Sequence, residues 1–220
     1  MRTDLTYTVD QFAPVGQTMA TSNTLVVNPK KLDIKTFAEL LDELKKNPGK
    51  YNYSTSGVGG LSHLIHELMM VKTGTKITHI PYGGAPEATT ALVAGEVDLA
   101  IISTTPILPF LESGDLRALA VAQPKRIAEL PDVPSIHEIV PEYEGVNNWN
   151  GVFAPAGTPK EIVDKMNAAM KPYLESAEGK AAMEKIGAEA ATLTPEEFDA
   201  LIKKEIEVWR EVIATAGLTP

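Results

Sequence analysis

The stretch STSGVGGLSHL, residues 54–64, combines residue types that could carry out chemistry or bind a ligand. It holds three glycines, four side-chain hydroxyls and one histidine between a strand-like run, KYNY, and an apolar helical run, LIHELMMV. A loop of this composition at a strand-to-helix junction suits three chemistries: it could cradle a phosphate, activate a nucleophile or bind a carboxylate.

The first two chemistries lack parts of their motifs. Gly57 and Gly59 fit the first two glycines of the dinucleotide fingerprint GxGxxG, but Ser62 stands where the third belongs. No Lys follows Gly60, as a Walker loop would require. A serine nucleophile would lack both the GxSxG turn and an Asp in an orienting position.

A metal pair is a further alternative. His63 and His66 are three residues apart, and Glu67 is four residues after His63, so the three side chains would share one helix face. A metalloprotease helix reads HExxH, however, and this helix reads HLIHE. The simpler interpretation is that His63 docks at the helix start, and that His66 and His79 are partly buried packing residues.

Carboxylate binding uses what the loop contains. Glycines let a backbone approach a ligand, and the free N–H groups of a first helical turn carry a positive partial charge. Neighbouring hydroxyls add donors without adding a full charge, so an anion would bind reversibly. A second glycine turn, Tyr82-Gly83-Gly84, precedes another predicted helix and could aim more N–H groups at the same place. The alternative is that both loops are only tight turns.

The composition excludes several function classes. The chain has 220 residues, is 44% hydrophobic and carries a formal charge of −9, which argues against nucleic-acid binding. It has no cysteine, which excludes disulfides and thiolate chemistry. No apolar run approaches the roughly 20 residues that cross a bilayer, and the first residues lack the apolar core of a signal peptide.

Strands and helices alternate along the chain, which predicts an α/β fold with mostly parallel sheets. A short β-branched strand is expected at 24–28, and buried-type strands are expected at 97–102 and 116–122. The helix after residue 33 has Phe37, Leu40, Leu41 and Leu44 at helical spacing, and NPG ends it. Two helices are expected to begin with capping boxes, one at Thr158 with Glu161 and one at Thr194 with Glu197.

Four ordered blocks of the sequence resemble a known family, the tripartite tricarboxylate transporter receptors, also called the Bug family. The blocks are KNPGKYNYSTSGVGGLSHL, THIPYGGAPEATTALVAGEVDLAI, LESGDLRALAVAQPKRIAELPDVPSIHE and WNGVFAPAGTPKEIVDKMNAAM. The resemblance implies a type II periplasmic-binding-protein-like architecture, in which two α/β lobes are joined by crossover strands and close around a ligand. It implies no catalysis and no cofactor.

The same resemblance implies a ligand and a set of ligand-binding residues. Family members bind small organic acids and deliver them to the membrane permease subunits of the transporter. The family's SSGxG loop maps onto residues 55–59, its helix-start His onto His63, and its VPYxG turn onto Pro81, Tyr82 and Gly84. The expected ligand-binding residues are Thr55, Ser56, Gly57, Gly59, Gly60, Ser62, His63, Tyr82, Gly83, Gly84, Ser103 and Thr104.

The chain departs from the family pattern in two ways. Members often carry an Asp-Asn pair after the VDL strand, where this chain has Ile102 and Ser103, so hydroxyls are expected to replace the amide. The family's leading segment, with its signal peptide and opening strands, is not in this sequence. We therefore expect lobe 2 at 27–150 and an incomplete lobe 1 built from 1–26 and 151–220, whose open sheet favours a dimer.

These observations predict an extracytoplasmic receptor that captures a small organic carboxylate and passes it to a membrane transporter, acting in the periplasm and not as an enzyme. The alternative is a cytoplasmic ligand-sensing or regulatory domain of the same fold without a transport role.

Overall fold

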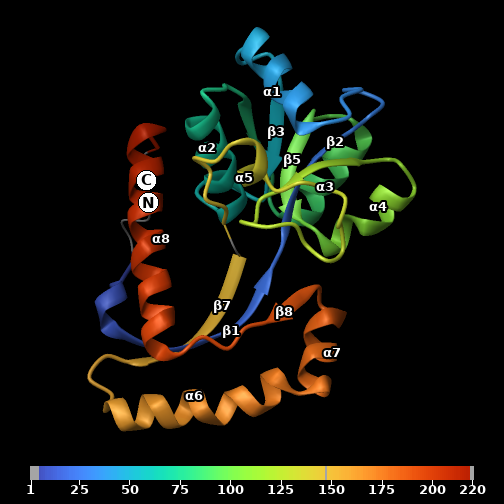
Figure 1. Cartoon of the computed structure of the whole chain (residues 1–220). Coiled ribbons are helices and arrows are strands. Elements are labelled where there is room, and N and C mark those ends of the chain that lie inside the picture. Colours follow the sequence, from blue (N-terminus) through green and yellow to red (C-terminus); the bar gives the residue numbers. More distant parts are fainter. Residues whose placement is uncertain (1–4, 147, 219–220) are drawn as a thin grey trace. The chain divides into compact units, whose positions relative to one another are not determined.

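The structure is a computed structural model that describes residues 5–146 and 148–218. The chain forms two compact units, the first from Met1–Thr21 with Asn148–Pro220 and the second from Ser22–Asn147 (Figure 1). The boundaries expected at 27 and 150 differ from these, because Asn23–Val27 is a strand of the second unit and Asn148 begins a strand of the first. Residues 1–4 of the expected first segment lie outside the described residues.

The second unit is built on a five-stranded sheet. Its strand order is β4 (Thr78–Pro81), β3 (Asn52–Thr55), β5 (Leu99–Ser103), β2 (Asn23–Val27) and β6 (Arg117–Val121). Strand β3 is parallel to β4 and β5, whereas β2 is antiparallel to both of its neighbours. The carboxyl ends of β3, β4 and β5 therefore share one edge of the sheet with the start of β2.

Helices cover both faces of this sheet. The helices are α1 (Phe37–Lys46), α2 (Leu61–Thr73), α3 (Ala85–Ala94), the short η2 (Thr105–Ile107), α4 (Leu108–Glu112) and α5 (Ile136–Ile139). Consecutive residues of β3 point to opposite faces. The ring of Tyr53 stacks on His66 of α2, while the hydroxyl of Ser54 donates to the carbonyl of Ala88 in α3. Helices α2 and α3 thus lie on opposite sides of the sheet (Figure 1).

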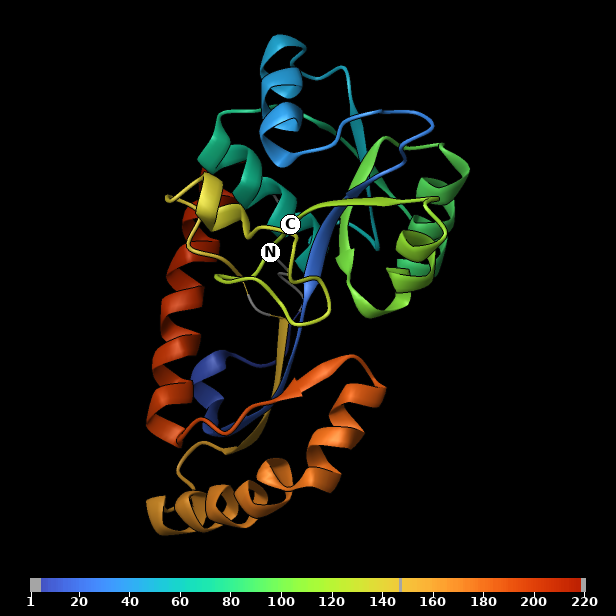
Figure 2. The ribbon, with the colours of Figure 1, turned by 45° about the vertical axis from the view of Figure 1, so that its right-hand side comes forward.

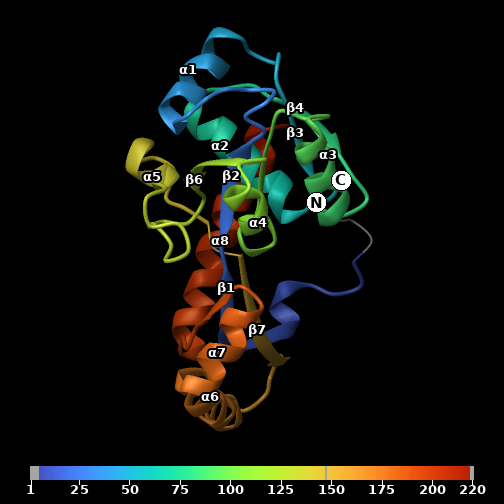
Figure 3. The ribbon, with the colours of Figure 1, turned by 90° about the vertical axis from the view of Figure 1, so that its right-hand side faces the viewer.

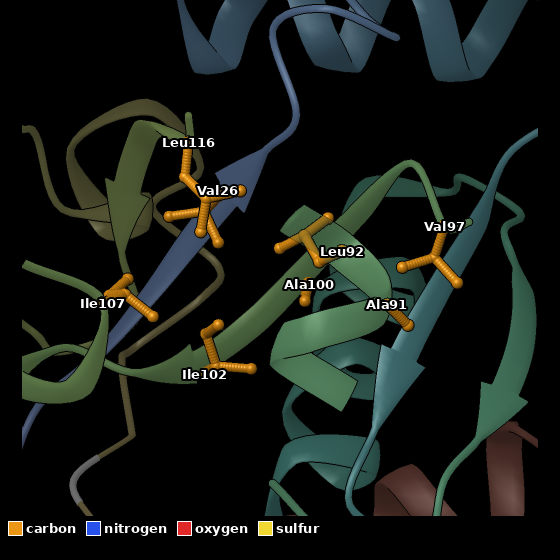
Figure 4. Close-up of a cluster of buried hydrophobic side chains, with 8 residues drawn as sticks. All are labelled: Val26, Ala91, Leu92, Val97, Ala100, Ile102, Ile107 and Leu116. Carbon is orange, nitrogen blue, oxygen red and sulfur yellow. The ribbon is translucent and has the colours of Figure 1, made fainter. Parts of the chain in front are cut away.

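The core on the α3 side is apolar and closely packed. Leu92 of α3 lies over Ala100 and Ile102 of β5, with Val26 of β2 beside them (Figure 4). On the other face, all four residues of the predicted helical stripe in α1, including Phe37 and Leu44, are buried. This packing holds the strand ends, and the loops that follow them, in fixed positions.

The first unit is smaller and its sheet is antiparallel. Strand β1 (Phe12–Thr21) lies between β7 (Asn148–Pro155) and β8 (Ala188–Ala190). Around it are η1 (Val9–Gln11), α6 (Lys160–Glu175), α7 (Ala177–Lys185) and α8 (Pro195–Thr215). Helices α6 and α8 flank β1 and β7 (Figure 2), and α7 follows α6 at the same end of the unit (Figure 3).

The expectation of mostly parallel sheets is wrong. Among the described strands, parallel pairing is confined to β3 with its neighbours β4 and β5, apart from one isolated bridge between Val121 and Ser135. Strand β2 enters the sheet at the edge where β5 ends, so it must run against β5 and β6. A single residue, Ser22, connects β1 to β2.

One of the two predicted capping boxes is confirmed. Thr194 accepts the N–H of Glu197, whose carboxylate accepts the N–H of Thr194, and α8 begins there. The box at Thr158 is wrong, because α6 begins one residue later than expected, after Pro159. The hydroxyl of Thr158 instead donates to the carbonyl of Pro155 at 2.8 Å.

Candidate functional site

The predicted binding residues gather at the carboxyl edge of the second unit's sheet. Residues 56–60 follow β3, residues 82–84 follow β4, and Thr104 follows β5. The N–H of Tyr82 donates to the carbonyl of Thr55 at 3.0 Å, so the first two loops lie next to each other. A Cβ placed on Gly57 would stand 3.9 Å from the carbonyl oxygen of Tyr82, which confirms this contact.

The loop after β3 needs its glycines for its shape. Gly57 has φ +136° and Gly59 has φ +74°, conformations that side chains with a Cβ rarely adopt. The hydroxyl of Thr55 accepts the N–H of Gly57 at 3.3 Å, which folds the loop back on the end of β3. Gly60, with φ −70°, is the N-cap of α2.

The N-terminus of α2 is open. Gly60 has no side chain to cap the helix, and no acidic residue lies in the first turn. The N–H groups of Leu61, Ser62 and His63 have no partner among the described residues, as helix geometry leaves them unless a cap supplies one. Ser56 is exposed, and its hydroxyl lies 3.4 Å from that of the half-buried Ser62. Backbone and hydroxyl donors therefore converge at a positive helix end.

His63 holds this loop through a hydrogen bond to its backbone. It is only 3% exposed, and its Nδ1 accepts the N–H of Gly59 at 3.0 Å. Its Nε2 lies 3.4 Å from the carboxylate of Glu67, which also accepts the hydroxyl of Tyr53 at 2.9 Å. Burial lowers the pKa of His63, against the opposing effect of Glu67. The neutral imidazole thus bridges the loop to its own helix.

Three histidines and Tyr53 form a stack beneath the loop. The ring of Tyr53 lies 4.1 Å from that of His66 and 5.0 Å from that of His79, and His79 lies 4.0 Å from His63. Burial lowers the pKa of His66 to about 3 and that of His79 to about 4. Neutral rings can stack at these distances without repulsion.

This stack is not a metal pair. His66 Nδ1 lies 2.6 Å from the carbonyl of Ser62, and its Nε2 accepts the N–H of Ile101 at 2.9 Å. Both ring nitrogens are therefore engaged, and Nδ1 carries the proton. Within residues 5–146 and 148–218, no group of three or more His, Asp or Glu side chains is placed to hold a metal ion. The metal alternative for HLIHE has no support in the geometry.

The glycine turn after β4 differs from the loop after β3, because one of its N–H groups is bonded to a carboxylate of the protein. The N–H of Gly83 donates to the carboxylate of Glu87 at 3.0 Å. The side chain of Tyr82 packs against the apolar cluster under α3, and burial together with Glu96 raises its pKa. Gly84 is the N-cap of α3 and has no side-chain cap. The turn adjoins the α2 loop, but one of its donors already has an anionic partner.

The residues after β5 divide between the surface and the interior. Ser103 is exposed at the sheet edge and lies opposite Asn23 in the register of β5 and β2. Thr104 is fully buried, and its hydroxyl lies 2.7 Å from that of Thr24. Its N–H donates to the carbonyl of Ser22 at 3.0 Å. Ser103 is thus placed to reach a ligand, whereas the Thr104 side chain braces the strand end.

Sequence reasoning missed two polar residues at this edge. The Oγ of Ser22 and the Nδ2 of Asn23 are buried without a hydrogen-bond partner in the described part of the chain. Buried polar atoms without partners are rare, so each is a candidate ligand contact. The signal was SNTLVV, in which polar residues open a buried strand. In a mostly parallel sheet, as expected from the sequence, the start of that strand would lie at the opposite edge.

Comparisons with known proteins identify the family and support the fold. Residues 1–218 match the family model described as tripartite tricarboxylate transporter family receptor. A UPF0065 protein from the tcbD-tcbE intergenic region of Pseudomonas sp. strain P51 is 34% identical over 92% of this chain and 60% of its own length. The chain thus spans about three fifths of the length of that relative.

Solved structures are also similar. Rpa4515 of R. palustris, solved with adipate, is 36% identical with a TM-score of 0.80, covering 96% of this chain and 70% of that one. The periplasmic binding protein BugD is 31% identical with a TM-score of 0.75 over 94% of this chain and 70% of that one. MatC from Rhodopseudomonas palustris, with bound malate, is 28% identical with a TM-score of 0.77, covering 96% and 72%. The expected α/β binding-protein fold is confirmed.

Proposed function

Because the chain belongs to the tripartite tricarboxylate transporter receptor family, we propose that it binds a small organic carboxylate at the open N-terminus of α2. The carboxylate accepts hydrogen bonds from the first-turn N–H groups of α2 and from the hydroxyls of Ser56 and Ser62. Ser103, Asn23 and Ser22 lie along the same edge and supply further donors.

The observation that carries this proposal is the uncapped start of α2. A Gly N-cap without a side-chain cap, followed by a first turn without acidic residues, leaves donors and a positive partial charge facing outward. Residues 54–64, 82–84 and 103–104 contain no Lys or Arg. Neutral donors at a helix end bind an anion reversibly, which suits a receptor that must release its ligand.

The chemistry of the site favours binding over catalysis. His63 and His66 have both ring nitrogens close to protein partners, and His79 Nε2 lies 2.6 Å from the hydroxyl of Thr55. A general base must have a lone pair within reach of the proton that it removes. These imidazoles instead support the loop, in keeping with the non-enzymatic receptor class of the family.

We propose that the protein works in the periplasm, where BugD is found, and delivers its ligand to the permease subunits of a tripartite transporter. Relatives solved with adipate and malate support a carboxylate ligand. The periplasmic relatives favour this role over a cytoplasmic sensing domain. The expected dimer is a separate prediction, which light scattering of the purified chain tests.

A pair of substitutions at Leu61 tests the binding site. Leu61 is the first residue of α2, and the preceding Gly60 has φ −70° and ψ 165°, a conformation that a following proline accepts. Leu61→Pro therefore removes one N–H with little strain, while Leu61→Ala removes the same side chain and keeps the N–H. Isothermal titration with adipate and malate should show about tenfold weaker binding for Leu61→Pro than for Leu61→Ala, equal to about 1.4 kcal/mol. Equal affinities for the two variants would overturn the assignment of the site.

A further inference from the structure

The glycine turn at residues 82–84, before α3, is a second place at this sheet edge where an anion could bind. We propose that the carboxylate of Glu87 occupies it, and that the protein thereby selects ligands that present a single carboxylate to the second unit. The inference rests on the proposed function and adds to it the class of acid that the site prefers. It assigns Glu87 as a specificity-determining residue.

The Glu87 carboxylate lies against the glycine turn that precedes α3. Glu87 is in the first turn of α3, and its Oε2 accepts the N–H of Gly83 at 3.0 Å. A Cβ placed on Gly83 would stand 2.9 Å from Oε2 and 3.5 Å from Oε1, so the whole carboxylate covers the turn. A ligand carboxylate approaching Gly83 would have to occupy the same space.

The neighbouring starts of α2 and α3 differ in their acidic residues. Helices α2 and α3 both follow a parallel strand of the same sheet, and both begin at a glycine N-cap without a side-chain cap. Their preceding loops touch, since Tyr82 donates to the carbonyl of Thr55. Helix α2 has no acidic residue in its first turn, whereas α3 has Glu87. Pro86 further removes an N–H from the start of α3.

The charge and polarity of the two loops also favour a ligand with a single carboxylate near α2. Because residues 54–64 and 82–84 carry no Lys or Arg, no cation there offsets the charge of Glu87. A second ligand carboxylate held close to α2 would therefore meet a like charge that no side chain of these two loops offsets. Val58, flanked by Gly57 and Gly59, is 67% exposed, and it offers an apolar surface beside the open helix start. One carboxylate with an apolar or uncharged neighbouring segment fits these surroundings.

The expected size of the effect follows from Coulomb's law. Two unit charges about 4 Å apart in a watery environment repel each other enough to change an affinity about fivefold. The effect falls with salt, because both charges are exposed to solvent. Glu87→Gln keeps a carbonyl oxygen that can accept the Gly83 N–H and removes only the charge.

The experiment compares matched acids on matched variants of the full chain. Butyrate and succinate have the same four-carbon backbone and differ in the second carboxylate, and tricarballylate adds a third. Titrations at low salt should show that Glu87→Gln binds succinate and tricarballylate about fivefold tighter than the unsubstituted chain does, with a change below twofold for butyrate. Glu112→Gln, an equal charge change at an exposed position in α4, should leave all three affinities unchanged.

The outcomes separate this inference from the proposed function. If butyrate and succinate bind but Glu87→Gln shifts both affinities by the same factor, or by none, the selectivity role of Glu87 is wrong and the carboxylate site stands. If none of the three acids binds to the unsubstituted chain or to Glu87→Gln while adipate or malate binds, the selectivity role of Glu87 is wrong and the proposed function stands. If none of these five acids binds, the proposed function fails, and the inference fails with it. A gain for succinate that disappears in 0.5 M salt supports the electrostatic origin.

Discussion

The Nδ1 atom of His63 accepts the N–H of Gly59 across 3.0 Å, so the first turn of α2 holds the loop that leads into it. Since the same imidazole lies 3.4 Å from Glu67, the loop, the helix start and the buried stack form one connected network. The N–H of Gly59 is therefore not available to a ligand. The donors that remain are those of the helix start itself.

Two substitutions of His63 test this supporting role. His63→Leu leaves the Gly59 N–H without an acceptor, which should lower the free energy of unfolding by about 1–3 kcal/mol. His63→Asn places a carbonyl oxygen near the position of Nδ1 and should lose less. Urea unfolding measures both values. An equal loss for the two variants would contradict the importance of the Gly59 hydrogen bond.

The glycines of the loop should differ in their tolerance of a side chain. Gly57→Ala places a Cβ at φ +136°, a conformation that costs about 1–3 kcal/mol for other residues. Gly60→Ala, at φ −70° and with its nearest contact at 3.6 Å, should change stability by less than about 1 kcal/mol. Thermal unfolding of the two variants checks the difference, and a larger loss for Gly60→Ala would show that the loop has another shape.

The pair of hydroxyls at Thr24 and Thr104 is expected to be structural. Thr24→Val or Thr104→Val alone leaves one buried hydroxyl without its partner and should cost about 1–3 kcal/mol, whereas the double variant should cost less than the sum. Carboxylate affinity should change less than twofold in the double variant. A tenfold loss of affinity on Thr104→Val would restore the role of ligand donor that the sequence predicted for Thr104.

The buried histidines should make stability depend on pH. The pKa of His66 is about 3 and that of His79 about 4 in the folded protein, whereas an unfolded His has a pKa of about 6.5. Below pH 6.5 the unfolded chain therefore binds protons that the folded chain does not, so stability is full above 6.5 and falls toward pH 4. Each histidine contributes a slope of about 1.4 kcal/mol per pH unit.

Urea unfolding at pH 7, 6 and 5 measures this dependence in a range above the ordinary carboxylate pKa values. His79→Phe keeps an aromatic ring against Tyr53 and His63 and removes one titrating group, so its slope should be smaller. A free energy of unfolding that stays constant from pH 7 to pH 5 would mean that these rings are solvated.

Periodicity and local signals were enough to predict most elements of the fold. The stripe from Phe37 to Leu44 predicted α1 because an amphipathic helix repeats every 3.6 residues. Gly95 ends α3 with φ +77°, as a C-terminal stop should. Strand direction could not be predicted in the same way, because the pairing of β2 with β5 and β6 joins segments far apart in the sequence.

The candidate site was predicted only in part, because its local features can be recognised in the sequence and its tertiary contacts cannot. Glycine and hydroxyl spacing located the α2 loop, since the need for positive φ at Gly57 and Gly59 is a local property. The partners of the donors are tertiary: Thr104 pairs with Thr24, 80 residues away. The Gly83–Glu87 contact spans only four residues, and an acidic residue in a first turn is a known capping signal, so it could have been recognised.

The most direct test of carboxylate binding at α2 is the response of individual backbone amides. Nitrogen–proton correlation spectra of the labelled chain, recorded while adipate is added, should show saturable shifts concentrated at Val58, Gly60, Leu61 and Ser62. Adipamide, which lacks the charge, should leave these signals in place. Saturable shifts that cluster elsewhere in the chain, or none from 56 to 63 at concentrations where calorimetry detects binding, would contradict the account.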